Sequence, residues 1–306
     1  MIKLDANGEF DEVRIADFLR GPLMAPFEDV EPAYAALMAL QRRCARRFGI
    51  LRATIRAIQA IGELLRFAEA HGPSKVRIVA TSAVRDAANK EIFQAEVKKA
   101  TGWPLQILNE REEALLIGRG ISSDPGLPDR RSFCAIDLGG GSMEYIHYKD
   151  GRMERGVSLP LGAVRFTRNL ASDGKLPISD LEAESIRKQV TGHLERSSLT
   201  GSPNGLLVGC GGAFSVSRAI FADRSGQSDE ETSPTLRVSH LQQLYEEIRR
   251  IPLAERCEIS QLPNGRADIL PAALQILLTV AEHFDCKNYH HSHYNLRFGL
   301  AATLRP

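Results

Sequence analysis

Residues 136–144 of this chain have the sequence Ile-Asp-Leu-Gly-Gly-Gly-Ser-Met-Glu. An apolar run from Phe133 leads into it, and a run of alternating apolar residues, 145–148, follows it directly. This pattern predicts two β-strands joined by a tight turn that carries almost no side chains. Backbone N–H groups in a glycine-rich turn can surround an anion, so we expect phosphate to bind here; a hairpin turn without a ligand is the alternative. The expected phosphate ligands in this turn are Gly139, Gly140, Gly141 and Ser142.

A carboxylate and a second glycine-rich segment extend the expected site. Asp137 ends the incoming strand, where its side chain can hold a divalent cation over the bound anion. Further along, the apolar run from Leu206 to Val208 predicts a buried strand that ends in Gly-Cys-Gly-Gly-Ala at residues 209–213. Two glycine-rich strand ends among mixed strands and helices indicate an α/β protein whose ligand lies at the carboxyl ends of strands.

The composition is that of a soluble protein with two domains. The chain has 306 residues, 43% of them hydrophobic and 25% charged. We expect domains over residues 1–120 and 121–306, with the last helix packing back on the first domain. No apolar run approaches the ~20 residues that cross a bilayer, and a signal-peptide pattern is missing, so we expect a cytoplasmic protein. A net charge of +1 favours neither DNA nor a membrane as partner, and we interpret the arginines within 42–47 as a solvated helix face.

The cysteines and histidines do not indicate a structural metal site. The five cysteines are scattered without a C-x-x-C pair, which favours reduced thiols, and we expect Cys134 and Cys210 in the core. His290, His291 and His293 form a cluster without a second liganding segment. We therefore interpret them as part of a polar surface strand, with a metal site as the less favoured alternative.

Local patterns predict the elements around these segments. A helix over Arg52 to Ala70 follows from apolar residues at helical spacing and from Gly72-Pro73 after it. Gly118, Gly120 and the loop over 122–131 are expected to form the hinge between the domains. The other expected elements are a hairpin over 2–15, helices over 31–47, 110–118, 214–221, 270–284 and 296–304, strands over 76–80 and 105–108, and two helices that begin with capping boxes, Ser179 with Glu182 and Ser239 with Gln242.

Four segments, in one order, resemble the motifs of a known family. They are residues 80–89 (ATSAVRDAAN), 112–117 (EEALLI), 137–144 (DLGGGSME) and 158–165 (SLPLGAVR), with weaker similarities at 209–213, 262–268 and 296–300. Together they resemble the exopolyphosphatase / guanosine-pentaphosphatase (Ppx/GppA) phosphatases over roughly residues 53–304. The resemblance implies a two-lobed α/β fold of the actin, sugar-kinase and heat-shock-chaperone (ribonuclease H-like) type, with phosphate bound in the cleft between the lobes.

The same resemblance implies a reaction. Members of this family release terminal phosphate from polyphosphate, or the 5′ γ-phosphate from guanosine pentaphosphate, by attack of water and usually with Mg²⁺. Polyphosphate or a guanosine polyphosphate is therefore the expected partner. Whether the protein forms a homodimer is left undecided by the sequence. A non-catalytic relative that binds phosphate or a nucleotide, or that serves mainly as an interaction protein, is the alternative.

Matched motif by motif, the resemblance also implies the site residues. Glu113 is implied as the residue that activates the attacking water, and Arg85 as an arginine that neutralises phosphate. Asp137 and Glu144 are implied as the acidic residues around the phosphate and the metal. Three of them have a simpler alternative: an exposed helical glutamate for Glu113, an ion pair with Asp86 for Arg85, and an outward strand position for Glu144. The second glycine-rich segment adds Gly209, Gly211 and Gly212 to the expected phosphate ligands.

The chain departs from the family pattern at its start. Family members begin with a strand that carries a first phosphate loop, Asp-x-Gly-Ser-Asn-Ser, and no such segment is found here. Residues 1–8 instead resemble the family's second strand and turn. We therefore expect a first lobe that is incomplete, with one metal-binding aspartate and part of the phosphate clamp missing.

Overall fold

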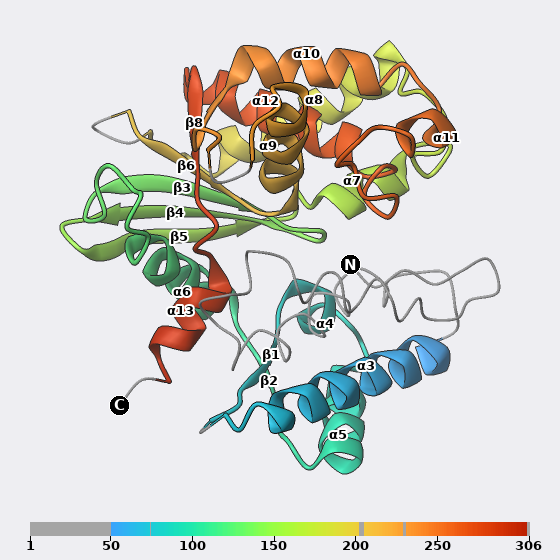
Figure 1. Ribbon diagram of the computed structural model, residues 1–306, viewed down its shortest axis with the longest axis vertical. Helices are drawn as coiled ribbons and strands as arrows, with labels where there is room; N and C mark the ends of the chain where they lie inside the picture. Colours follow the sequence, from blue (N-terminus) through green and yellow to red (C-terminus); the bar gives the residue numbers. More distant parts are fainter. Residues whose placement is uncertain (1–49, 74, 202–204, 229–230, 305–306) are drawn as a thin grey trace. The chain divides into compact units, whose positions relative to one another are not determined.

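A computed structural model describes residues 50–304, apart from 74, 202–204 and 229–230 (Figure 1). The hairpin expected over 2–15, the helix expected over 31–47 and the arginines within it lie outside the described residues. The chain divides into two compact units. Unit 1 holds the described residues up to Glu113 together with those from Leu300 onward, and unit 2 is Ala114–Gly299. Each unit is described by itself.

Unit 1 contains a parallel pair of strands whose carboxyl ends are each followed by a helix. Strand β1 pairs with β2 in parallel, with Ile78 opposite Leu105 and Ala80 opposite Ile107. Because parallel strands end at the same edge of a sheet, helices α4 and α6 begin side by side. Helices α3 and α5 pack on each other, and α3 buries apolar residues at helical spacing, from Ala57 to Ala68. The bounds are α3 (Ile50–Ala70), β1 (Ile78–Ala80), α4 (Ser82–Arg85), α5 (Lys90–Thr101), β2 (Leu105–Ile107) and α6 (Glu110–Ser122).

Unit 2 is built on a mixed sheet of the order β5-β4-β3-β6-β8-β7. The strands are β3 (Phe133–Leu138), β4 (Met143–Lys149), β5 (Arg152–Leu159), β6 (Leu207–Cys210), β7 (Thr235–Arg237) and β8 (Asn288–His291). Helix α12 is buried along most of its length and contacts α7, α8, α9 and α10, which gather on one side of the strands (Figure 1). The helices are α7 (Ala163–Asn169), α8 (Asp180–Arg196), α9 (Gly212–Arg224), α10 (Val238–Ile248), α11 (Leu253–Arg256), α12 (Leu270–His283) and α13 (Leu296–Ala302).

The two cysteines expected in the core lie on the central strands of this sheet. Cys134 in β3 and Cys210 in β6 have no exposed surface, which confirms that expectation. Cys134 contacts the hydroxyl of Tyr145, which donates a hydrogen bond to the carbonyl of Thr200. Burial raises the pKa of both thiols. Cys134 belongs to the apolar core that also contains residues of α12, whereas the Cys210 thiol lies 4.0 Å from the carbonyl of Tyr294.

The interpretation of the histidine cluster as a surface strand is wrong. Strand β8 lies inside the sheet, between β6 and β7, and His290 and His291 are 8% and 2% exposed. The ring of His291 stacks with Phe214, and its Nε2 atom lies 3.3 Å from the Ser215 hydroxyl. Because the His291 ring finds partners on α9, a polar side chain is accommodated in this buried strand. Burial lowers the pKa of both histidines.

The glycines expected at a hinge are packing residues within a helix. Helix α6 continues through Gly118 and Gly120 to Ser122. A Cβ atom on Gly120 would lie 2.0 Å from the carbonyl oxygen of Asn295, and one on Gly299 would lie 1.8 Å from that of Leu116. The backbones of α6 and α13 therefore approach each other more closely than any side chain would permit. Glycine is required there for packing.

One of the two expected capping boxes forms. Ser179 and Glu182 exchange hydrogen bonds at the start of α8, as expected. Helix α10 instead begins at Val238 without a side-chain cap, so the box expected from Ser239 is wrong. Strand β7 leads directly into α10, and the backbone N–H of Val238 donates to the carbonyl of Lys287 (2.9 Å). A neighbouring loop thus replaces the cap.

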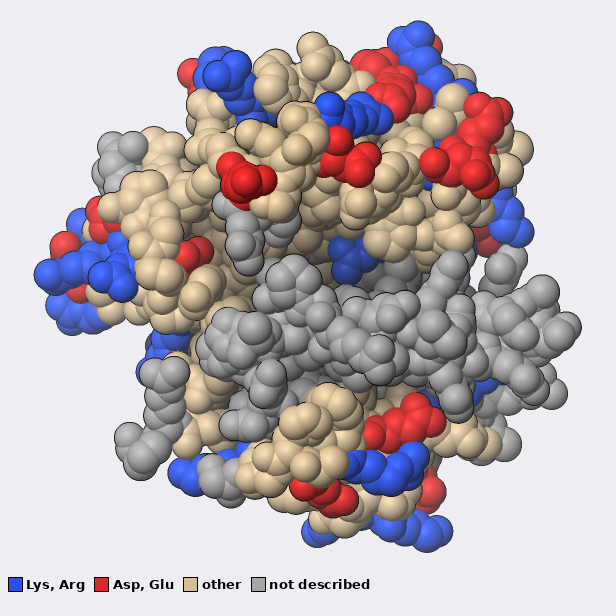
Figure 2. All heavy atoms as spheres, viewed as in Figure 1, with Lys and Arg blue, Asp and Glu red and all other residues tan. Residues whose placement is uncertain are grey.

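The charges of the described surface are mixed. On the face shown in Figure 2, basic and acidic side chains are interspersed. Ion pairs between described residues include Arg224 with Glu247 (2.6 Å) and Arg250 with Glu246 (2.9 Å). Among the helices that the structure describes, none is both long and apolar enough to cross a membrane.

Candidate functional site

Helix α6 begins with a capping box that separates two adjacent glutamates. The Asn109 side chain accepts a hydrogen bond from the Glu112 backbone N–H, and the Glu112 carboxylate accepts one from that of Asn109, both at 2.9 Å. Glu112 is thereby held at the exposed start of the helix, where it completes the cap. The next residue, Glu113, points inward and is 5% exposed. The alternative of an ordinary exposed glutamate is therefore wrong for Glu113.

The partner of Glu113 is Arg85, at the end of α4. The Arg85 Nη1 atom donates to Glu113 Oε2 (2.7 Å) and also to the carbonyl of Leu108 (3.0 Å). These groups meet because α4 follows β1 and α6 follows β2 at the same edge of the parallel pair. The structure thus brings together two residues of separate sequence motifs. The expected alternative partner of Arg85 was Asp86, whereas the contact that the structure shows is with Glu113.

Burial raises the pKa of the Glu113 carboxyl above its usual range. The Arg85 contact and the nearby Thr81 hydroxyl act in the opposite direction, and Glu110 adds a smaller upward effect. A buried carboxylate with a raised pKa is a stronger base than an exposed one. Perturbation of this kind, from desolvation together with one specific charge, is typical of a functional carboxylate.

The glycine-rich turn of residues 139–142 is fixed by the start of α7. The backbone N–H groups of Ala163, Val164 and Arg165 donate to the carbonyls of Gly139 and Gly140 at 2.9–3.1 Å. The carbonyl oxygens of Gly139 and Gly140 therefore point toward α7 and accept hydrogen bonds from its backbone. We infer that the turn's remaining N–H groups are the ones available to an anion.

Gly162 permits this close contact between α7 and the turn. A Cβ atom at Gly162 would lie 2.2 Å from the Gly141 carbonyl carbon and 2.3 Å from the Gly140 oxygen. Backbone atoms occupy the place of a side chain, so the shape of the turn depends on a residue outside it. The motif over 158–165 is therefore structurally part of the same site.

The two carboxylates expected near the metal differ in their surroundings. Asp137 and Glu144 are opposite each other in the β3–β4 pairing, so they share one face of the sheet. Asp137 is partly exposed at the strand end, whereas Glu144 is 2% exposed. Glu144 Oε1 accepts hydrogen bonds from the hydroxyls of Ser142 (2.7 Å) and Ser158 (2.8 Å). Glu144 thus orders the turn from within and is no outward strand residue.

The second glycine-rich segment serves two purposes. Gly209 lies inside β6, where a Cβ atom would come within 2.4 Å of the Phe214 ring, so its lack of a side chain makes room for packing. Gly211 has φ +103, a conformation that favours glycine, and precedes the first residue of α9. A Cβ atom on Gly211 would lie 3.0 Å from Asp137 Oδ1. Gly211 and Gly212 thus bring the α9 N-terminus to Asp137, and the phosphate role of all three glycines stays a prediction.

Sequence reasoning assigned no role to two arginines at these turns. The Arg165 Nε atom donates to the Gly141 carbonyl, and Arg266 Nη1 donates to the Gly212 carbonyl, both at 2.9 Å. Each places a guanidinium beside a glycine-rich turn. Both lie in quoted segments, 158–165 and 262–268, and the signal that could have found them is an arginine recurring in each segment that accompanies a glycine turn.

The residues around Asp137 fit a magnesium ion that is held mainly by phosphate. Among the described residues, no three His, Cys, Asp or Glu side chains converge to form a metal site. Mg²⁺ usually keeps several waters and takes one or two carboxylates plus substrate phosphates, so a single accessible aspartate beside a phosphate turn is sufficient. Glu144, with two serine hydroxyls on one oxygen, fits less well as a direct ligand. Both metal roles stay predictions.

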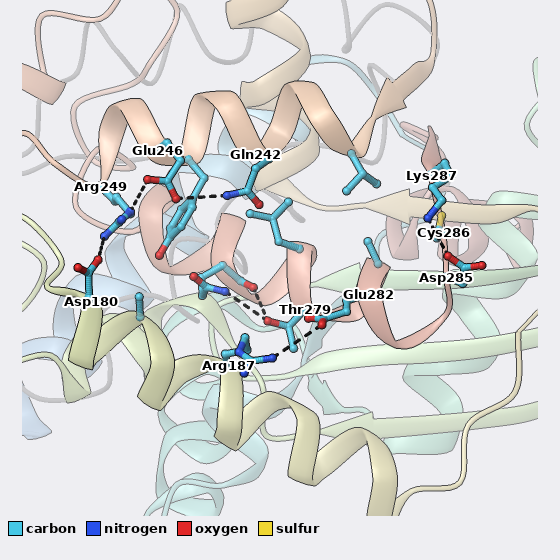
Figure 3. A pocket seen from close by; sticks show the side chains of 16 residues that line it. Asp180, Arg187, Gln242, Glu246, Arg249, Thr279, Glu282, Asp285, Cys286 and Lys287 are labelled. Carbon is cyan, nitrogen blue, oxygen red and sulfur yellow. Dashed lines mark hydrogen bonds and ion pairs between the residues drawn. The ribbon is translucent and has the colours of Figure 1, made fainter.

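A separate surface pocket of about 510 Å³ lies among α8, α10 and α12 of unit 2 (Figure 3). Arg249 at its rim pairs with Asp180 (2.8 Å) and Glu246 (2.9 Å), and Arg187 lies 3.7 Å from Glu282. The rim charges therefore largely cancel. Its lining contains none of the residues expected to bind phosphate, so this pocket is distinct from the candidate site.

Comparison with known proteins places this geometry in a family. The model of the Ppx/GppA phosphatase family matches residues 50–305. Exopolyphosphatase 1 of Mycobacterium leprae (strain TN) is 30% identical over 220 residues, which are 71% of this chain and 64% of that protein. The chain thus spans less than two thirds of that relative's length.

Two solved structures share the fold. The exopolyphosphatase from Cytophaga hutchinsonii ATCC 33406 is 22% identical with a TM-score of 0.71, over 82% of this chain and 81% of its own. The Aquifex aeolicus member of the Ppx/GppA family is 22% identical with a TM-score of 0.70, over 87% and 85%. These similarities confirm the expected α/β fold class. With the family model matched from residue 50 to residue 305, the chain belongs to the Ppx/GppA phosphatase family.

Proposed function

We propose that this protein is a phosphoanhydride hydrolase that releases terminal phosphate from polyphosphate. The observation that carries the proposal is the buried Glu113 carboxylate, held 2.7 Å from Arg85 at the edge of the β1–β2 pair. Hydrolysis of a phosphoanhydride needs an oriented water and cancellation of charge on the phosphoryl oxygens, and little other chemistry. Glu113 and Arg85 are suited to these two tasks.

The step balances with these groups. Water forms a bond to the terminal phosphorus while the bridging P–O bond breaks, and the electron pair stays on the shortened chain. Glu113 accepts the proton of the attacking water, and the Arg85 guanidinium offsets the negative charge of the phosphoryl oxygens. The products are inorganic phosphate and a polyphosphate one unit shorter. A raised pKa at Glu113 suits this role, because the carboxylate must be basic enough to take the proton near neutral pH.

Polyphosphate is the favoured substrate because the mycobacterial relative at 30% identity is an exopolyphosphatase. Guanosine pentaphosphate, the other substrate class of the family, differs by a nucleoside that needs a base-binding surface. Phosphate release from polyphosphate and from guanosine pentaphosphate, measured at equal phosphoanhydride concentration, tests this preference. Preferential release from the guanosine compound would overturn it.

We further propose that Asp137 binds Mg²⁺ together with the phosphate held at residues 139–142. When bound, the ion would neutralise phosphate oxygens and so relieve their repulsion from the carboxylate. The Asp137 side chain would orient it, and the turn's N–H groups would hold the phosphate itself. A cytoplasmic location suits both proposed substrates.

Replacing Asp137 with alanine should remove the effect of Mg²⁺ on phosphate binding. In the unmodified protein, Mg²⁺ should strengthen the binding of methylenebisphosphonate, which resists hydrolysis, by roughly 10-fold or more, because even outer partners of a metal are worth ~10–100-fold. Isothermal calorimetry with and without Mg²⁺ measures this. Asp223→Ala is the matched control, since it removes the same charge from an exposed position on α9. A Mg²⁺ effect that survives in Asp137→Ala would contradict the assignment.

A further inference from the structure

The Arg85–Glu113 contact opposes the reaction that it is proposed to serve. A carboxylate bound to a guanidinium is a weaker base than a free one, because the positive charge favours its ionised form. The same Arg85 Nη1 atom that donates to Glu113 also donates to the Leu108 carbonyl, so this nitrogen is shared between two acceptors. A phosphoanhydride, with several anionic oxygens, competes for the guanidinium. Glu113 would then lose the contact that orients it.

Thr81 is the residue placed to take over that contact. It follows the last residue of β1, and its carbonyl accepts hydrogen bonds from the backbone N–H groups of Val84 and Arg85 in α4. Its side chain has no exposed surface. The hydroxyl neither caps α4, the usual task of threonine at this position, nor makes a hydrogen bond of good geometry with any described residue.

Strand pairing places Thr81 next to the start of α6, the helix that carries Glu113, because Ala80 is opposite Ile107 and the Leu108 N–H donates to the Ala80 carbonyl (2.8 Å). The Thr81 hydroxyl is among the groups that lower the pKa of the Glu113 carboxyl, after burial raises it and Arg85 lowers it. A buried hydroxyl without a hydrogen bond is unfavourable, so a nearby acceptor that becomes available will attract it. Glu113 is such an acceptor once Arg85 moves to the ligand.

We propose that Thr81 is a positioning residue that holds the Glu113 carboxylate when a phosphoanhydride ligand draws Arg85 away. This inference rests on the proposed function. Before the ligand binds, Arg85 keeps Glu113 ionised and oriented. After binding, Thr81 alone orients it, and the buried carboxylate, freed of the cation, becomes a stronger base. The charged groups that face Glu113 are Arg85 and, more weakly, Glu110.

Removing the hydroxyl while keeping the shape tests this role. Thr81→Val should lower kcat for phosphate release by roughly 10–100-fold with KM changed less than about threefold, because a misplaced base slows the chemical step more than binding. Thr81→Ser should restore most of the rate. Thr101→Val is the matched control and should behave as the unmodified protein, since its hydroxyl bonds to Val97 at the end of α5. A full-rate Thr81→Val would overturn the proposal.

A second measurement does not depend on turnover. Carbon-13 NMR of carboxyl-labelled glutamate follows the Glu113 pKa, with Glu113→Gln to assign the signal. Thr81→Val should raise that pKa clearly in the presence of methylenebisphosphonate and much less in its absence, because Arg85 is the stronger partner of the carboxylate until the ligand draws it away. An equal effect in both states, or no response of Glu113 to the ligand, would overturn the proposal. If the unmodified protein released no phosphate, the proposed function would fail, whereas the NMR result would still decide the role of Thr81.

Discussion

Replacing Glu113 with glutamine is expected to reduce phosphate release by about 10²–10⁴-fold, the usual contribution of a positioned general base. The amide keeps the size of the side chain and can still accept a hydrogen bond from Arg85, but it cannot take a proton from water. Folding and ligand binding should therefore change little. The measurement is the steady-state rate of phosphate release from polyphosphate with Mg²⁺, alongside thermal unfolding of both proteins.

The neighbouring glutamate provides a matched control. Glu112→Gln makes the same chemical change one residue earlier, and glutamine also completes a capping box. We expect its rate to equal that of the unmodified protein.

The rate in the unmodified protein should also fall as the pH drops through the raised pKa of Glu113, because only the ionised carboxylate accepts a proton. Equal rates for Glu113→Gln and the unmodified protein would remove Glu113 from the mechanism.

Replacing Gly162 with alanine should distort the glycine-rich turn of residues 139–142, although Gly162 lies outside that turn. The backbone of Gly162 has φ −72 and ψ 139, which alanine adopts readily, so backbone strain does not contribute. The added methyl group would overlap backbone atoms of Gly140 and Gly141 at 2.2–2.4 Å. Because backbone cannot rotate aside as a side chain can, the turn or α7 must shift. We expect a loss of about 1–3 kcal/mol in the free energy of unfolding.

The shift should also weaken binding of methylenebisphosphonate, measured by calorimetry at a temperature where the variant is folded. Gly201→Ala is the control, because a methyl group there would meet nothing nearer than 3.9 Å. Denaturant unfolding of both variants separates stability from binding. A Gly162→Ala protein with unaltered stability and affinity would contradict the dependence of the turn's shape on Gly162.

Local sequence patterns predicted the elements that depend on local causes. The hairpin around residues 139–142 formed as expected, because glycines and alternating apolar residues determine a turn and its strands at short range. The capping box at Ser179 formed for the same reason. The family motifs located Glu113 and Arg85, but they could not show that the two residues contact each other, because that contact depends on the parallel pairing of β1 and β2.

Long-range packing accounts for what the sequence could not predict. His291 has no sequence signal of burial, since its partners Ser215 and Phe214 come from α9, more than 70 positions away. Gly120 looks like a hinge because glycine usually weakens a helix, whereas here the approach of α13 requires it. The contacts of Glu144 with the Ser142 and Ser158 hydroxyls likewise had no signal in the sequence, and its metal role stays a prediction. For His291 and Gly120, residues distant in sequence decide the role.

Because Cys134 and Cys210 are buried, the reactivity of their thiols can report on opening of the protein. Neither thiol can meet a reagent in the folded chain, and the raised pKa of each reduces the reactive thiolate further. Because the two sulfurs lie on adjacent central strands, their alkylation requires the sheet of unit 2 to open. In a chain whose other cysteines are replaced, the alkylation rate would then measure how often that sheet opens under native conditions, without denaturant.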